Sequence, residues 1–167
     1  MAIRKVVYLP SEVLRSVGKP VVQFDDALRA LIADMFETMY YTKGVGLAAQ
    51  QIGISLQLAV IDVIGDKSQQ IVLANPKILA LEGQKEYQEG CLSVPGAYDT
   101  VIRADKVTVQ AQDAFGEVFE MTADGLLGEC IQHEVDHLNG KLFVDLLSPL
   151  KRSMARRRMD KHLRNKS

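Results

Sequence analysis

The residues best suited to chemistry lie at positions 133–137, in the segment His133-Glu134-Val135-Asp136-His137. On an α-helix, residues four positions apart lie on one face, so both imidazoles can bind the same metal ion. The glutamate beside the first histidine can then transfer protons next to that ion. This HExxH pattern is typical of metal-dependent hydrolases, although a surface helix with two solvated histidines would also produce it.

The residues around the motif favour a helix. Gly140 can cap the C-terminal end of such a helix. The apolar residues recur at helical spacing: Leu126, Leu127, Cys130, Ile131 and Leu138. We therefore predict a helix over residues 123–139.

A catalytic metal of this kind needs about three protein ligands, and the chain's two cysteines are candidates for the third. Cys130 lies on the same helical face as His133. It is seven residues from His137, about 10.5 Å along the axis, so convergence on one ion would be strained. Cys91 follows Gly90 outside the helix, and a loop or strand end could direct its sulfur toward the helix face. We favour Cys91 and expect Cys130 to pack beneath the site, while an inert buried thiol remains the alternative for both.

The composition is that of an ordinary globular protein, and it limits the classes that the chain can belong to. The 167 residues are 47% hydrophobic and 25% charged, which suits a single domain spanning residues 1–167. No apolar run reaches the roughly 18 residues of a membrane span, and the N-terminus lacks the apolar stretch of a signal peptide. We expect a cytoplasmic protein with no membrane attachment, and two cysteines do not suggest a secreted disulfide framework.

The order of the predicted elements indicates an α+β fold. Strands should cluster in the middle of the chain and helices at its ends, rather than alternating. Asp25 or Asp26 can cap a first helix, and Ser148-Pro149 can open a last one. The expected helices are 25–41, 123–139 and 149–167; the expected strands are 56–63, 70–73, 106–111 and 117–122; the expected turns are Gly65-Asp66, Asn75-Pro76 and 113–116.

Three motifs together resemble those of the peptide deformylases. The first is Gly44-Val45-Gly46-Leu47-Ala48-Ala49-Gln50-Gln51, the second is Glu89-Gly90-Cys91-Leu92-Ser93, and the third is Gln132-His133-Glu134-Val135-Asp136-His137-Leu138. The resemblance extends over essentially the full chain. It implies a monomeric enzyme in which mostly antiparallel sheets surround the HExxH helix, and which removes the N-formyl group from the initiator methionine of new proteins.

The resemblance also implies the parts of the site. The metal, Fe(II) with zinc or nickel as substitutes, would be held by Cys91, His133 and His137, and this ligand set does not choose between those ions. Metal-bound hydroxide would attack the formyl carbon, with Glu134 moving the proton. The Gln51 amide and the Leu92 backbone N–H would stabilise the oxyanion. Gln51 can equally be a structural amide that ties the glycine-rich loop to the sheet.

Other residues are expected to bind substrate or to support the ligands. Arg103 is a candidate ion-pair partner of Glu89 that would fix the Cys91 loop, with two ordinary surface charges as the alternative. The expected substrate-binding residues are Gly44, Val45, Gly46, Glu89, Leu126, Glu129 and Cys130.

Two positions depart from the family pattern. Glu129 occupies a position that is aliphatic in many members and lines the methionine pocket. A carboxylate in an apolar pocket is costly, so we expect Glu129 to turn to solvent at the rim; the alternative is a modified pocket with changed side-chain preference. Tyr98 replaces a basic residue of some relatives, and could stack on peptide or simply pack its loop.

The charge of the chain is unevenly distributed. After Leu150 there are eight basic residues and one acid, whereas the rest of the chain has a net charge of −8. Such a basic helix is usually a solvated face, but in related bacterial enzymes it contacts the ribosome, and RNA phosphate would attract it. We expect ribosome contact here and a solvated His162.

Two other functions compete with a deformylase. A generic zinc peptidase would need a further ligand downstream of His137, where only His162 remains. A ribosome-associated protein without catalysis would be expected to have lost Gln51, Cys91 or Glu134.

Overall fold

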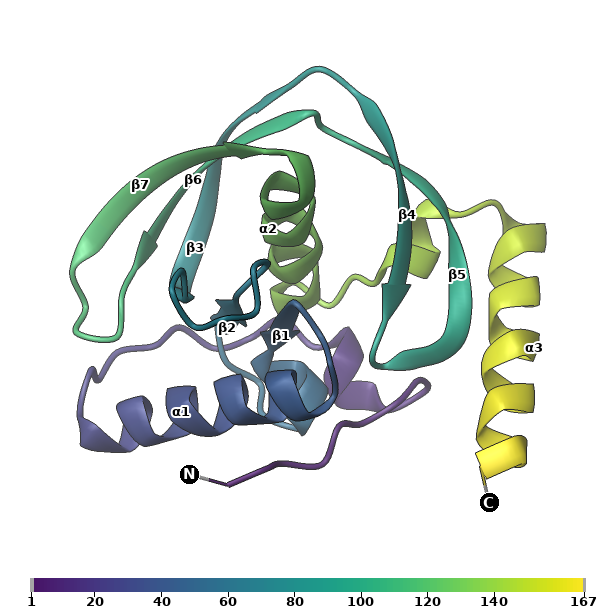
Figure 1. Ribbon diagram of the computed structural model, residues 1–167, viewed down its shortest axis with the longest axis horizontal. Helices are drawn as coiled ribbons and strands as arrows, with labels where there is room; N and C mark the ends of the chain where they lie inside the picture. The colour runs from purple at the N-terminus through teal and green to yellow at the C-terminus, as the bar shows by residue number, and fades with distance from the viewer. Residues whose placement is uncertain (1, 167) are drawn as a thin grey trace.

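Two antiparallel sheets and three α-helices make up the part of the chain that the computed structural model describes, residues 2–166 (Figure 1). The larger sheet has the strand order β1-β2-β3-β6-β7, and the smaller one is the β4–β5 hairpin. The strands are β1 Gly46–Ala48, β2 Leu58–Ile61, β3 Ile71–Glu82, β4 Lys85–Cys91, β5 Val94–Arg103, β6 Lys106–Gln112 and β7 Val118–Asp124. The helices are α1 Asp26–Tyr41, α2 Gly125–Leu138 and α3 Pro149–Lys166. The predicted α+β class is confirmed.

The motif helix α2 lies between the large sheet and the β4–β5 hairpin (Figure 1). Its apolar face packs on the sheet through the buried residues Cys130, Ile131, Val135 and Leu138. The helix begins two residues later than predicted because β7 continues to Asp124. It ends at Leu138, shortly before Gly140 adopts a left-handed φ of 78°. Burial of this face orients the opposite side of α2 toward the hairpin.

Helix α1 supports β1 and β2 from below, as Figure 1 shows. The Asp25 carboxylate accepts a hydrogen bond from the Leu28 N–H at 3.0 Å, which confirms the predicted N-cap. The buried face of α1 includes Ile32, Met35 and Met39. This packing supports the segment that leads into β1.

The predicted turn at Asn75-Pro76 is wrong, because β3 runs through both residues. Asn75 has a left-handed φ of 50°, and the register with β6 shifts between Ala74 and Lys77, so the two residues form a bulge. The Asn75 side chain bonds to the backbone of Val21 and to Gln112, which offsets the local disruption of the ladder. The bulge bends a strand of 12 residues instead of ending it.

The β4–β5 hairpin did not appear among the predicted strands, yet it carries the Cys91 motif. Gly90 pairs with Tyr98, and Cys91 pairs with Val94 across the turn at Leu92-Ser93. Cys91 is therefore a strand end, one of the two settings considered for it.

The basic helix α3 packs against β5 (Figure 1). The Ser148 hydroxyl accepts a hydrogen bond from the Lys151 N–H, as predicted for an N-cap followed by proline. Ala155 and Met159 are buried against the hairpin, whereas the remaining faces are exposed. None of the helices in residues 2–166 is both long and apolar enough to cross a membrane.

Candidate active site

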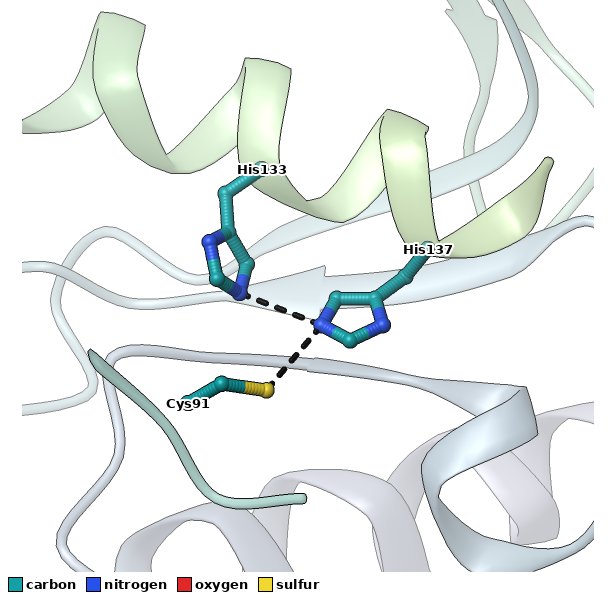
Figure 2. Close-up of side chains that lie close together, drawn as sticks. All are labelled: Cys91, His133 and His137. Atoms are coloured by element: carbon teal, nitrogen blue, oxygen red, sulfur yellow. Dashed lines mark hydrogen bonds between the residues drawn. The ribbon is translucent and has the colours of Figure 1, made fainter. Parts of the chain in front are cut away.

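Three potential metal ligands converge beside α2 (Figure 2). His133 and His137 are one turn apart, and their Nε2 atoms are 3.1 Å apart. The Sγ of Cys91 lies 3.3 Å from His137 Nε2. All three ligand atoms lie within 4.8 Å of one another, so one ion could contact them together, and two imidazoles with one sulfur suit zinc, iron or nickel.

Backbone packing and two polar hydrogens hold the sulfur in position. Gln51 Nε2 donates to Cys91 Sγ at 3.6 Å, and the Ser93 N–H donates at 3.4 Å. Gly90 packs directly against the Tyr98 ring. A Cβ at position 90 would overlap with Tyr98 Cε1, so only glycine fits beside the ring just before Cys91. The position of Cys91 is therefore determined by both strands of the hairpin and by the segment after β1.

A buried ion-pair network orients the first histidine. Glu89 accepts a 2.8 Å hydrogen bond from His133 Nδ1 and two bonds from the guanidinium of Arg103. Arg103 also donates to Asp136 at 2.9 Å. Burial would raise the pKa of Glu89, but the bonds from His133 and Arg103 hold it at about 2. Carboxylates that fix the outer nitrogen of a histidine are a usual part of metal sites, and Arg103 is not a surface charge.

The carboxylate of Glu134 is buried beside the two histidines. Its Oε1 has no hydrogen-bond partner among the described residues, and burial raises its pKa to about 7. A Cβ at position 46 would lie 2.6 Å from Glu134 Oε2 and 2.9 Å from Cys130 Sγ. Gly46 is therefore needed so that β1 can approach the HExxH helix this closely.

The Gln51 side chain bridges β1 and the Cys91 segment. Its Oε1 accepts from the Ala48 N–H at 2.9 Å, and its Nε2 also donates to the Ser93 hydroxyl at 3.3 Å. The structural role considered for Gln51 is thus observed. Leu92 follows Cys91 in the chain and lies at the wall of the same cleft.

These groups open into one cleft of about 700 Å³. All seven residues expected to bind substrate line it: Gly44, Val45, Gly46, Glu89, Leu126, Glu129 and Cys130. The lining residues that the sequence patterns missed lie in several segments of the chain: Val6, Tyr8, Tyr41, Thr42, Lys43, Gln88, Pro95, Gly96 and His162. These residues belong to no recognised motif, so their sequence positions do not indicate that they line the cleft.

The expected solvent position of Glu129 is wrong. The residue is only 9% exposed and forms part of the cleft wall. Burial and the neighbouring carboxylate of Glu89 raise the pKa of Glu129 to about 7. A place in the pocket wall was the alternative considered from the sequence, and the choice between the two depends on how the hairpin packs against α2. Tyr98, by contrast, is 69% exposed at the rim.

Cys130 is packed beneath the site, as expected from its distance to His137. It is buried, and its Sγ lies 3.8 Å from the Val45 carbonyl oxygen. Burial raises the pKa of the Cys130 thiol well above its usual range. Among the described residues, the three-ligand group therefore contains Cys91 and not Cys130.

Comparisons with known proteins agree on one family. The family model described as polypeptide deformylase matches residues 3–153. The peptide deformylases of Cellvibrio japonicus and Pseudomonas aeruginosa are 52% and 51% identical, covering 96% and 100% of this chain and the same shares of theirs.

Solved structures give the same result. A peptide deformylase from Legionella pneumophila superposes with a TM-score of 0.97 at 65% identity, covering 99% of this chain and 98% of that one. A peptide deformylase from Synechococcus elongatus, solved in complex with actinonin, has a TM-score of 0.89 at 45% identity, covering 95% of this chain and 87% of that one.

Proposed function

Since the chain belongs to the polypeptide deformylase family, whose members remove formyl groups from new polypeptides, we propose that its cleft hydrolyses N-formylmethionyl peptides and releases formate. The observation that carries the proposal is the convergence of Cys91, His133 and His137 beside the buried carboxylate of Glu134. This combination would supply a metal ion and a proton acceptor in one cleft, which supports amide hydrolysis.

The proposed metal ligands are Cys91, His133 and His137. We propose Fe(II) as the resident ion, with zinc or nickel able to replace it, because one sulfur and two imidazoles suit all three. Such an ion would make water acidic enough to serve as a nucleophile near neutral pH. The bond between Glu89 and His133 Nδ1 leaves His133 Nε2 facing His137 and available for the metal.

Two sets of protein groups would act on the formyl amide. Glu134 Oε1 has no partner among residues 2–166, so it is free to take a proton from the attacking water and return it to the leaving amine. The Gln51 Nε2–H and the Leu92 backbone N–H would stabilise the charge that develops on the formyl oxygen. Both belong to segments that contact Cys91, which supports their proposed role.

The rest of the peptide would extend along β1. This strand is at the edge of the large sheet, so one side of its backbone is available for pairing with an extended chain. Gly44, Val45 and Gly46 all line the cleft.

The activity is tested by measuring formate release from formyl-Met-Ala-Ser with iron-loaded protein prepared without oxygen. We expect turnover of the formylated peptide and none of its acetylated counterpart, which has the same sequence but a larger acyl group. A protein that cleaves internal peptide bonds and releases no formate would contradict the proposal and indicate a peptidase.

We also propose that Glu129 changes the side-chain preference of the cleft. Replacement by isoleucine should alter the ratio of kcat/KM values for formyl-Met and formyl-Lys peptides by roughly tenfold in favour of methionine, the size expected when one polar wall contact is removed. Glu129→Gln is the matched control, because it keeps the shape and polarity of the side chain. Identical ratios in wild type and Glu129→Ile would exclude a role in the pocket.

The exposed side of α3 is a proposed contact with the ribosome. Arg157 and Lys161 are exposed there, whereas truncating α3 would also remove the buried Ala155 and Met159 and expose the apolar side of the hairpin on which they pack. We therefore expect the double substitution Arg157→Ala/Lys161→Ala to weaken ribosome binding. The slope of log K against log salt concentration should fall by the amount that about one to two phosphate contacts contribute. Kinetics on short peptides should stay unchanged. Co-sedimentation with ribosomes at several salt concentrations measures the affinity and its salt dependence.

The control is the double substitution Lys77→Ala/Lys106→Ala, which removes two exposed lysines of the large sheet. An equal effect of both double substitutions would refute a specific α3 contact.

A further inference from the structure

His162 belongs to the basic C-terminal helix, yet it forms part of the wall of the candidate active site. Its side chain lines the cleft together with Tyr8, Pro95 and Gly96, and it is half-buried rather than solvated. It comes 25 residues after His137, from a helix on the outer side of the hairpin (Figure 1). None of the proposed catalytic steps uses it.

Close packing fixes the position of His162 against the start of β5. Gly96 has a left-handed φ of 81°, and a Cβ there would lie 2.7 Å from the Cβ of His162 and 3.2 Å from the Arg158 carbonyl oxygen. One turn earlier, Arg158 Nη1 donates to the Tyr98 carbonyl at 3.3 Å. Buried Met159 anchors the same stretch of helix. His162 is therefore held at the cleft by the close approach of α3 to Gly96, by the bond from Arg158 to Tyr98 and by the burial of Met159.

The substrate of the proposed reaction must occupy more of the cleft than its formyl group. The formyl carbon has to reach the cluster of Cys91, His133 and Glu134, and everything else in the substrate lies on the C-terminal side of that carbon. A cleft of about 700 Å³ has the size of pockets that hold ligands much larger than one formylated residue. The walls away from the ligand cluster are thus available to the following residues of the peptide.

We propose that His162 positions the formylated peptide by contacting residues downstream of the first one. This inference rests on the proposed function. A histidine side chain can donate or accept a hydrogen bond with any peptide group, and its ring can pack on aliphatic atoms. It can therefore bind downstream residues of variable sequence, as a substrate class made of many different new proteins requires.

The test compares substrates of different length in His162→Ala. For a formylated hexapeptide we expect KM to rise by about threefold to tenfold with kcat nearly unchanged, the loss typical of one hydrogen bond or packed ring. For a formylated dipeptide with the same first two residues, both constants should equal those of the wild type. The matched control is Asn165→Ala on the exposed side of the same helix, for which both substrates should behave as in the wild type.

If His162 only stabilised the fold, its replacement would affect peptides of both lengths equally. Equal losses on both peptides, or no loss on either, would overturn the proposal. His162→Gln keeps hydrogen bonding and should restore most of the hexapeptide KM. If both variants unfold, ring NMR signals of His162 can be followed in the Glu134→Ala protein: a shift with the hexapeptide and not the dipeptide is expected, and no shift would overturn the proposal. Absence of formate release from either peptide by wild-type protein would overturn the proposed function as well.

Discussion

Replacing Glu134 with alanine is expected to lower kcat for deformylation by about 10²–10⁴-fold, the usual contribution of a general acid–base group. Bound metal should stay near one ion per chain, because the three converging ligand atoms belong to other residues. The physical reason is the environment of the carboxylate: it is buried beside both histidines, and its Oε1 has no partner in residues 2–166. Formate release and metal content are measured on the same preparation.

The control for this experiment must separate loss of the proton acceptor from loss of packing. Glu134→Gln fills nearly the same volume next to Gly46 but cannot accept the proton, so it should be as impaired as the alanine variant. The exposed Glu120→Gln should retain wild-type activity. Near-full activity of Glu134→Ala would show that another group moves the proton. Parallel loss of metal and activity would indicate a structural role instead.

The parts of the site that could be predicted from sequence are those governed by local geometry. The four-residue spacing of His133 and His137 determines that they share a helical face. The 10.5 Å estimate for Cys130 and His137, about seven helical rises, disfavoured Cys130 as a ligand, and the group of converging ligand atoms in residues 2–166 contains Cys91 instead. The N-caps at Asp25 and Ser148 are also local, because each bond joins residues three apart.

The parts that could not be predicted depend on tertiary contacts. Asn75-Pro76 has the composition of a turn, but bonds from Asn75 to Val21 and Gln112 let β3 continue as a bulge. Glu129 has the composition of a solvated helix residue, but the hairpin encloses it. His162 was expected in solvent because its helix is so basic, yet Gly96 of a distant strand brings it to the cleft. In each case a partner far along the chain overrides the local preference.

Replacing Cys91 with alanine is expected to lower metal affinity by more than the roughly 10–100-fold typical of losing an outer-sphere partner. The variant would remove one of three ligand atoms and leave two imidazoles whose Nε2 atoms are 3.1 Å apart. Gln51 Nε2 and the Ser93 N–H would also lose the sulfur to which they donate. Metal content after dialysis against a chelator measures the effect, with circular dichroism to show that the fold is retained.

Cys130→Ala is the matched control, because it removes the chain's other sulfur from a residue on the same helix as the histidines. It should keep wild-type metal content and lose only stability, since Cys130 is buried under β1. The opposite result, with metal lost from Cys130→Ala and retained by Cys91→Ala, would mean that the helix supplies all three ligands. That arrangement would require the side chains of residues 130 and 137 to span two helical turns. The 3.3 Å distance between Cys91 Sγ and His137 Nε2 needs no such distortion, and therefore favours the sulfur of the hairpin.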